Sequence, residues 1–175
     1  MTRRRLAGVA GALCLALAAG GCGSKPKDPP CPKVYMVDET TQLTRFRPGP
    51  GHDLTDVQFE AEISGYTGSC EYADRMLTIQ LNVGFAVRRG PANENREAKF
   101  EYFVAIPKLF PKPVGKRIFD VALQFPQNQR LAQFRDEIEL DVPIDNKAAG
   151  PANEIYIGLQ LSPEELDFNR KRSER

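Results

Sequence analysis

The sequence has no tryptophan, a single histidine and almost no net charge, with 24 basic residues against 23 acidic ones. An HExxH metalloprotease motif needs two histidines, so it is excluded, and the chain also lacks a nucleophile elbow and a glycine-rich phosphate loop. Because no excess of Lys and Arg creates a basic field, the composition gives no indication of a nucleic-acid partner. No enzyme class and no cofactor follow from these residues.

A membrane-length apolar segment is also missing. Residues 6–19, LAGVAGALCLALAA, are uncharged, but these 14 residues are fewer than the about 20 that a helix needs to cross a bilayer. The run follows three arginines, Arg3 to Arg5, and small residues come after it. This order is typical of a secretory signal peptide, which we predict at residues 1–21.

The end of this segment, Ala19-Gly-Gly-Cys22, resembles the lipobox of bacterial lipoproteins. The resemblance implies cleavage before Cys22 and a diacylglycerol on its sulfur, which anchors the protein in a membrane. Lipoproteins of this family that stay in the inner membrane often carry Asp after the cysteine, so the resemblance, with Gly23 in this position, implies the outer membrane and a protein that faces the periplasm. The alternative is ordinary cleavage nearby, which leaves a soluble periplasmic protein. Proline and charge predict an extended tether over residues 22–30.

The four cysteines divide into three roles. Cys14 leaves with the signal peptide and Cys22 carries the lipid, so Cys31 and Cys70 remain as one pair in an oxidising compartment. We predict a disulfide between them. The alternatives are a metal-binding pair or a catalytic thiol, and the sequence places no histidine near either cysteine to support them.

Much of the remaining chain alternates apolar and polar residues. Successive side chains of a β-strand point to opposite faces, so this period of two predicts strands with one buried face, separated by turns such as Ser64-Gly65. We predict one domain over residues 31–175, an all-β, immunoglobulin-like antiparallel β-sandwich of seven or eight strands. The expected strands are 57–63, 77–87, 99–107, 119–125, 138–144 and 155–161, with weaker ones at 34–37 and 43–46.

A short helix is expected to follow the last strand. Ser162, Pro163 and Glu165 have the spacing of a capping box with proline in the first turn. We expect Leu166 to pack on the sandwich and residues 170–175 to form a frayed basic tail.

The loop from Pro107 to Lys116 is the strongest candidate for a contact with a partner. It places two large apolar residues among lysines and prolines, a combination that suits a protein or membrane surface. The alternative is that the apolar residues fold back and cap the core. The candidate contact residues are Lys108, Leu109, Phe110 and Lys112.

Two groups of polar residues are weaker candidates. His52, Asp53 and Asp56 lie in a turn-rich stretch and suggest a metal site or a hydrolase that uses His52, although Asp is also a common turn residue. Glu60 and Glu62 share one face of a strand; paired carboxylates serve glycosidases, but two glutamates on a solvent-facing strand more often form a solvated surface, which we expect here.

Taken together, these features predict a non-enzymatic accessory protein. We expect a lipid-anchored periplasmic module, without a cofactor, that contacts another envelope protein. The alternatives are a carrier that binds a lipid, sugar or metal ion within the sandwich, and a hydrolase. Fold class alone does not choose among them.

Overall fold

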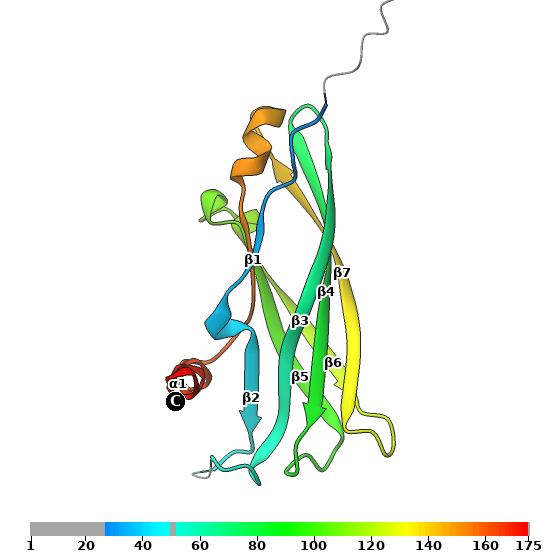
Figure 1. The fold of residues 1–175 in the computed structure, drawn as a ribbon, viewed down its shortest axis with the longest axis vertical. Coiled ribbons are helices and arrows are strands. Elements are labelled where there is room, and N and C mark those ends of the chain that lie inside the picture. Colours follow the sequence, from blue (N-terminus) through cyan, green and yellow to red (C-terminus); the bar gives the residue numbers. More distant parts are fainter. Residues whose placement is uncertain (1–26, 50–51, 175) are drawn as a thin grey trace, which may run out of the picture.

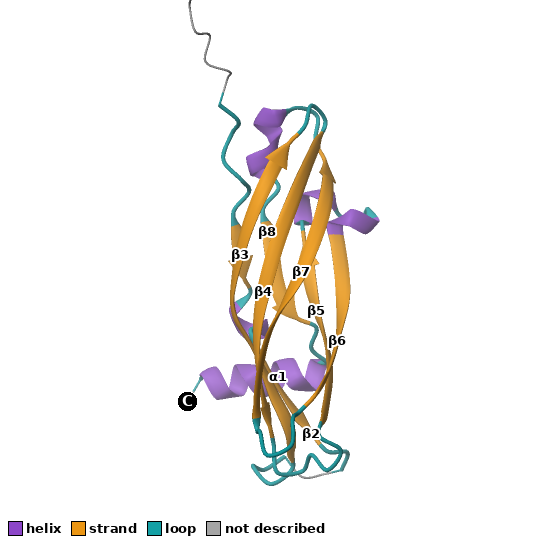
Figure 2. Ribbon diagram, turned by 90° about the vertical axis from the view of Figure 1, so that its right-hand side faces the viewer, coloured by secondary structure: helices purple, strands orange, loops and turns teal. Residues whose placement is uncertain are grey.

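The computed structural model describes residues 27–49 and 52–174. The predicted signal peptide, the predicted lipidation site Cys22 and most of the predicted tether lie outside the described residues. The described chain forms two sheets that pack face to face, and the long strands of one sheet run along most of the molecule (Figure 1). A single α-helix lies roughly perpendicular to the strands (Figure 2).

Each sheet has four strands. The first sheet has the order β1 (Val34–Met36), β8 (Ile155–Leu159), β5 (Glu97–Ala105) and β6 (Lys116–Gln124). The second has the order β2 (Gln42–Phe46), β3 (Val57–Tyr72), β4 (Met76–Arg89) and β7 (Leu131–Pro143). All neighbours are antiparallel except β1 and β8, which run parallel. The predicted all-β sandwich with a short C-terminal helix is confirmed.

The core fills the space between the two sheets with alternate side chains from each strand. Its centre is an aromatic cluster around Phe85 of β4, whose ring lies 5.7 Å from Phe100, 5.0 Å from Tyr102 and 5.2 Å from Phe134. Offset and edge-on ring contacts of this kind add to the free energy gained by burial. The prediction that the strand at 99–107 is central is confirmed, since β5 lies between β8 and β6.

Strand β3 is longer than the sequence indicates. We expected a strand over 57–63 and a turn at Ser64-Gly65, but the strand continues to Tyr72. A bulge shifts the register between Ile63 and Gly65, and Gly65 has a φ of 146°, which a residue with a side chain rarely adopts. After the bulge the inward-facing residues are the even-numbered ones, so the apolar alternation resumes out of phase. These are Tyr66, Gly68, Cys70 and Tyr72, which pair with the buried residues Val83, Leu81, Ile79 and Leu77.

The predicted disulfide is present. Cys31, just before β1, bonds to Cys70 of β3, and their Cα atoms are 5.8 Å apart. The bond joins the start of the first sheet's edge strand to the part of β3 that extends beyond its pairing with β2. It therefore holds the start of the domain against the hairpin formed by β3 and β4.

The C-terminal helix α1 (Pro163–Ser173) begins with the predicted capping box. The Glu165 amide donates to Ser162 Oγ at 3.2 Å, and the Ser162 amide donates to the Glu165 carboxylate at 2.8 Å. The expectation of a frayed basic tail is wrong, because the helix continues through these residues to Ser173. Asn169 is the buried residue of the helix, at 5% exposed, and Leu166 is half-buried.

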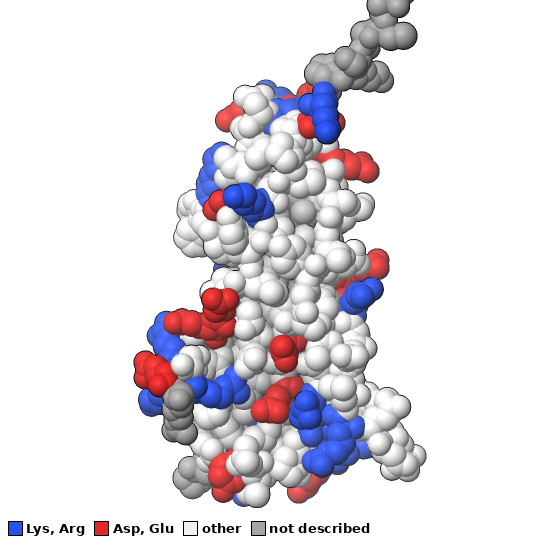
Figure 3. Space-filling view, viewed as in Figure 1, with Lys and Arg blue, Asp and Glu red and all other residues white. Residues whose placement is uncertain are grey.

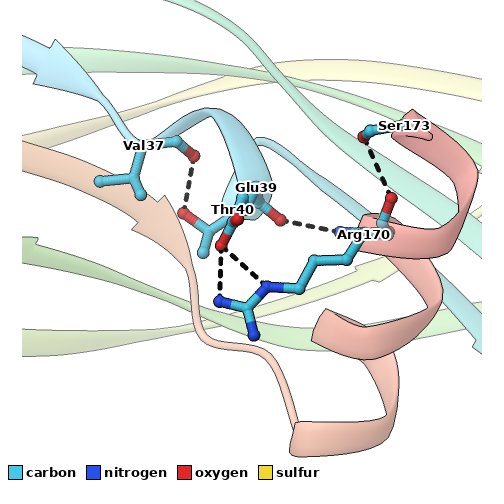
Figure 4. A network of polar contacts seen from close by, with 6 residues as sticks. Val37, Glu39, Thr40, Arg170 and Ser173 are labelled. Atoms are coloured by element: carbon cyan, nitrogen blue, oxygen red, sulfur yellow. Dashed lines mark hydrogen bonds and ion pairs between the residues drawn. The ribbon is translucent and has the colours of Figure 1, made fainter.

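Asn169 and Arg170 fix the helix to the segment between β1 and β2. The side-chain Nδ2 of Asn169 donates to the backbone carbonyls of Glu39 and Gln42 at 3.0 and 2.7 Å. The Arg170 guanidinium contacts the Glu39 carboxylate at 2.9 Å, and this pair lowers the pKa of Glu39 (Figure 4). Backbone carbonyls at the crossover between sheets are thereby satisfied by the helix.

Candidate functional site

The predicted contact loop joins β5 to β6 and is held by its own backbone. Two short 3₁₀ helices, Pro107–Leu109 and Pro113–Gly115, lie on either side of a cis peptide bond before Pro111. The Ile106 amide donates to the Gly115 carbonyl at 2.8 Å, which closes the base of the loop. A side chain at Gly115 would meet the backbone of Leu109 and Phe110 within 3.0 Å, so the tight fold of the loop requires glycine here.

Within this loop the two large apolar residues have different roles. Leu109 is half-buried and packs against the core, as the core-capping alternative expected. Phe110 is 69% exposed, and Lys108 and Lys112 beside it are exposed as well. The structure therefore leaves Phe110, rather than Leu109, as the apolar residue that is free to contact a partner.

The outer face of the first sheet adds further apolar surface next to this loop. We define the outer-face patch as Tyr35, Phe103, Ile118 and Tyr156. Phe103 of β5 pairs directly with Ile118 of β6, which is 52% exposed, and the Lys116 ammonium lies 4.8 Å above the Phe103 ring. Tyr35 and Tyr156 stack with their ring centroids 5.3 Å apart. Because Ala105 and Lys116 lie at the two ends of the contact loop, Phe110 projects from the same end of this sheet.

Sequence analysis missed the outer-face patch. The signal was present, because the segment around Phe103 is apolar on both faces and Ile118 is out of phase with Phe119, Val121 and Leu123, which face the core. We interpreted the two apolar faces only as a sign of a central strand. Strand pairing alone brings Ile118 beside Phe103, and the sequence does not specify that pairing.

The residues around His52 do not form a metal site in the described part of the chain, where no group of three potential ligands is found. Asp53 accepts from the amide and hydroxyl of Thr55 at 2.7 and 2.6 Å. Asp56, 3% exposed, pairs with Arg47. Both carboxylates therefore stabilise the loop, and Thr55 lowers the pKa of Asp53.

His52 packs its ring against Phe46, with centroids 4.9 Å apart, and makes no hydrogen bond to another described residue. A hydrolase would require a nucleophile within hydrogen-bond reach of this imidazole. Glu60 lies on the outer face of the second sheet, 3.9 Å from Arg88, and its neighbour Glu62 is exposed there too. This arrangement matches the solvated-surface interpretation of the two glutamates.

One buried ionisable group joins the two sheets. Tyr102 of β5 is fully buried, and its hydroxyl donates to the Asp136 carboxylate of β7 at 2.8 Å. Burial, followed by the hydrogen bond to Asp136, raises the pKa of Tyr102 well above its usual value. The ring also stacks on Phe119, with centroids 5.0 Å apart. The phenol therefore has a structural role on the side of the sandwich formed by β6 and β7.

Removing the Tyr102 hydroxyl tests whether its hydrogen bond to Asp136 stabilises the sandwich. We expect Tyr102→Phe to lower the free energy of unfolding by about 1–3 kcal/mol at neutral pH, because Asp136 loses its donor. Above about pH 10 the unfolded tyrosine ionises while the folded one stays protonated, so the stability of the wild type falls as pH rises. The variant lacks this dependence, and its deficit should shrink above pH 10. Urea unfolding between pH 7 and 11 measures both effects.

Tyr35→Phe provides the control, since Tyr35 is 38% exposed. Its free energy of unfolding should stay within about 0.5 kcal/mol of the wild type. An unchanged stability for Tyr102→Phe would show that the contact with Asp136 does not hold the sheets together.

Comparisons of the chain with protein-family models, with curated proteins and with solved structures find no match. Among the residues that the structure describes, no helix is both long and apolar enough to span a bilayer. A function for the chain is therefore inferred from its residues and their geometry.

Proposed function

We propose that the protein is a lipid-anchored accessory module of the bacterial envelope, without enzymatic activity of its own. The N-terminal resemblance to lipoproteins supports the anchor at Cys22 in the outer membrane and the periplasmic location. The disulfide between Cys31 and Cys70 is consistent with an oxidising compartment. The observation that carries the interaction role is the 69% exposure of Phe110 beside the outer-face patch.

This surface has the composition of a protein contact. Interface cores are enriched in aromatic residues, and an aromatic side chain that enters a pocket of the partner is the usual anchor of binding energy. Phe110 supplies such a side chain on a loop whose backbone is closed by hydrogen bonds. Lys108 and Lys112 give the rim a positive charge, which favours an acidic partner surface.

Co-purification after cross-linking tests the proposal. We expect an envelope protein to be recovered in stoichiometric amount with the wild type from detergent-solubilised membranes. The double variant Phe110→Ser with Ile118→Ser should lose most of it, because truncating an interface anchor typically costs about 2 kcal/mol or more. Quantitative mass spectrometry of the eluates measures the ratio.

Leu131→Ser is the matched control, because Leu131 is 48% exposed on the outer face of the second sheet, away from the patch. It should retain the partner. Equal recovery with the double variant would contradict this contact surface, and recovery of the protein alone from wild-type membranes would contradict the interaction role.

A further inference from the structure

A groove of about 340 Å³ opens between the edge of β1 and the upper half of β3. One end is closed by the disulfide, and the other end by the Ile63 amide, which donates to the Thr41 carbonyl at 2.9 Å. Between these ends, no described segment of the chain pairs with β3 on this side. The groove is separate from the outer-face patch except for Tyr35 at its rim.

Backbone groups of β3 point into this groove. At the end of the hairpin, the Ala73 amide donates to the Met76 carbonyl at 2.9 Å, so Ala73 is bonded to β4. Hydrogen bonding alternates along an antiparallel pair, and the register is unbroken back to Gly65. The amides and carbonyls that face away from β4 therefore belong to Tyr66, Gly68, Cys70 and Tyr72.

The edge of β1 faces the same space. The Lys33 carbonyl and the Val37 amide bond to β8 at 2.9 and 3.0 Å, so the intervening even-numbered residues, Val34 and Met36, point the other way. The Val34 carbonyl accepts from the Tyr66 hydroxyl at 2.9 Å, which confirms its direction. Two strand edges with unpaired backbone groups thus line opposite sides of one groove.

The floor of the groove is apolar. It is formed by Ile79, Leu81 and Ile155, which are at most 3% exposed, and Gly68 leaves them accessible because it has no side chain. A Cβ at Gly68 would lie 2.8 Å from a Leu81 methyl carbon. The surface over β1 and the upper half of β3 carries few charged side chains (Figure 3). Lys33 is the one charged residue among those that line the groove, so the lining favours an occupant with backbone hydrogen bonds and mostly uncharged side chains.

We propose that this groove binds an extended, uncharged peptide segment of a partner protein, which adds as a strand to the free edge of β3. An exposed edge is the usual template for such strand addition. The open stretch from Gly65 to Ser69 accommodates about five residues at about 3.3 Å each. Alternate side chains of the peptide lie on the apolar floor, as they do for a natural neighbouring strand. The hydrogen bond of Tyr66 to the Val34 carbonyl crosses the groove, and this side chain is displaced when the peptide enters.

The test begins with random linear dodecapeptides displayed on phage, selected on the full-length protein in detergent with its disulfide intact. We expect enriched peptides with alternating apolar residues and little charge. The affinity of the protein for a fluorescently labelled synthetic copy of one selected peptide is then measured by fluorescence anisotropy. Failure to enrich any such peptide overturns the proposal.

Two variants of one residue isolate the backbone contribution. Tyr66→Pro removes the amide that faces the groove, whereas Tyr66→Ala keeps this amide and loses only the side chain. We expect Tyr66→Pro to bind about tenfold more weakly than Tyr66→Ala, since one lost hydrogen bond accounts for that ratio. Equal affinities overturn strand addition.

A second measurement does not depend on the folding of a variant. The selected peptide is methylated at alternate amide nitrogens in two complementary sets, and each set is measured on the wild type. Strand addition predicts that one set loses at least about tenfold in affinity and that the other loses less. Equal losses in affinity for the two sets overturn the proposal. It is also overturned if the protein is a dimer that dissociates in the Tyr66→Pro variant, because a second copy of the chain then occupies this edge.

Discussion

Replacing Phe85 by alanine should lower the free energy of unfolding by about 3–5 kcal/mol, the cost of deleting an aromatic ring from a packed core. Phe85 is 1% exposed and contacts three other rings from both sheets. Its loss leaves a cavity that the surrounding strands cannot close without moving both sheets. Urea unfolding is followed by circular dichroism in the near and far ultraviolet. The midpoint of the transition and its slope with urea concentration give the free energy of unfolding.

Phe110→Ala is the matched control, because the same side chain is removed from a position that is 69% exposed. Its free energy of unfolding should remain within about 0.5 kcal/mol of the wild type. A comparable loss in both variants would contradict the assignment of Phe85 to the core and of Phe110 to the surface.

Removing the disulfide should have an effect of similar size. We expect the double variant Cys31→Ser with Cys70→Ser to lose about 4 kcal/mol, since the bond closes a loop of about 40 residues in the unfolded chain. The folded structure loses in addition the tie between the start of β1 and the hairpin of β3 and β4. The midpoint of urea unfolding, without reductant, measures the loss.

Reduction of the wild type should reproduce this loss, whereas Cys22→Ser, which leaves the loop closed, should not change the free energy of unfolding. Equal stability of the oxidised wild type and the double variant would show that the bond does not constrain the unfolded chain.

The alternation of apolar residues was sufficient to predict the fold class. In β4 every odd residue from Leu77 to Val87 is buried, as expected for a strand with one face on the core. The capping box at Ser162 and the pairing of Cys31 with Cys70 also followed from local patterns. Each of these features depends on spacing along one segment or on a count of residues, which the sequence contains directly.

The missed features depend on how distant segments meet. The bulge at Gly65 reverses the phase of β3, so its second half does not continue the first pattern. The parallel pairing of β1 with β8 and the burial of Asn169 against the carbonyls of Glu39 and Gln42 are tertiary contacts. Neither leaves a periodic signal in the sequence. The candidate surface around Phe110 was therefore predicted only in the loop and not on the sheet beside it.

The two proposals give the contact loop and the groove different roles in one sandwich. We propose that the outer-face patch and Phe110 present side chains to a folded partner, and that the edge of β3 presents backbone groups to an extended segment. Both would act on partners within reach of a membrane if Cys22 carries the lipid. The anchor is therefore the premise that gives the two surfaces their location.

Mass spectrometry of the protein extracted from membranes tests this premise most directly. We predict a mature chain that begins at Cys22 and carries a diacylglycerol on its sulfur. A chain that begins elsewhere, or that carries an unmodified Cys22, would contradict it.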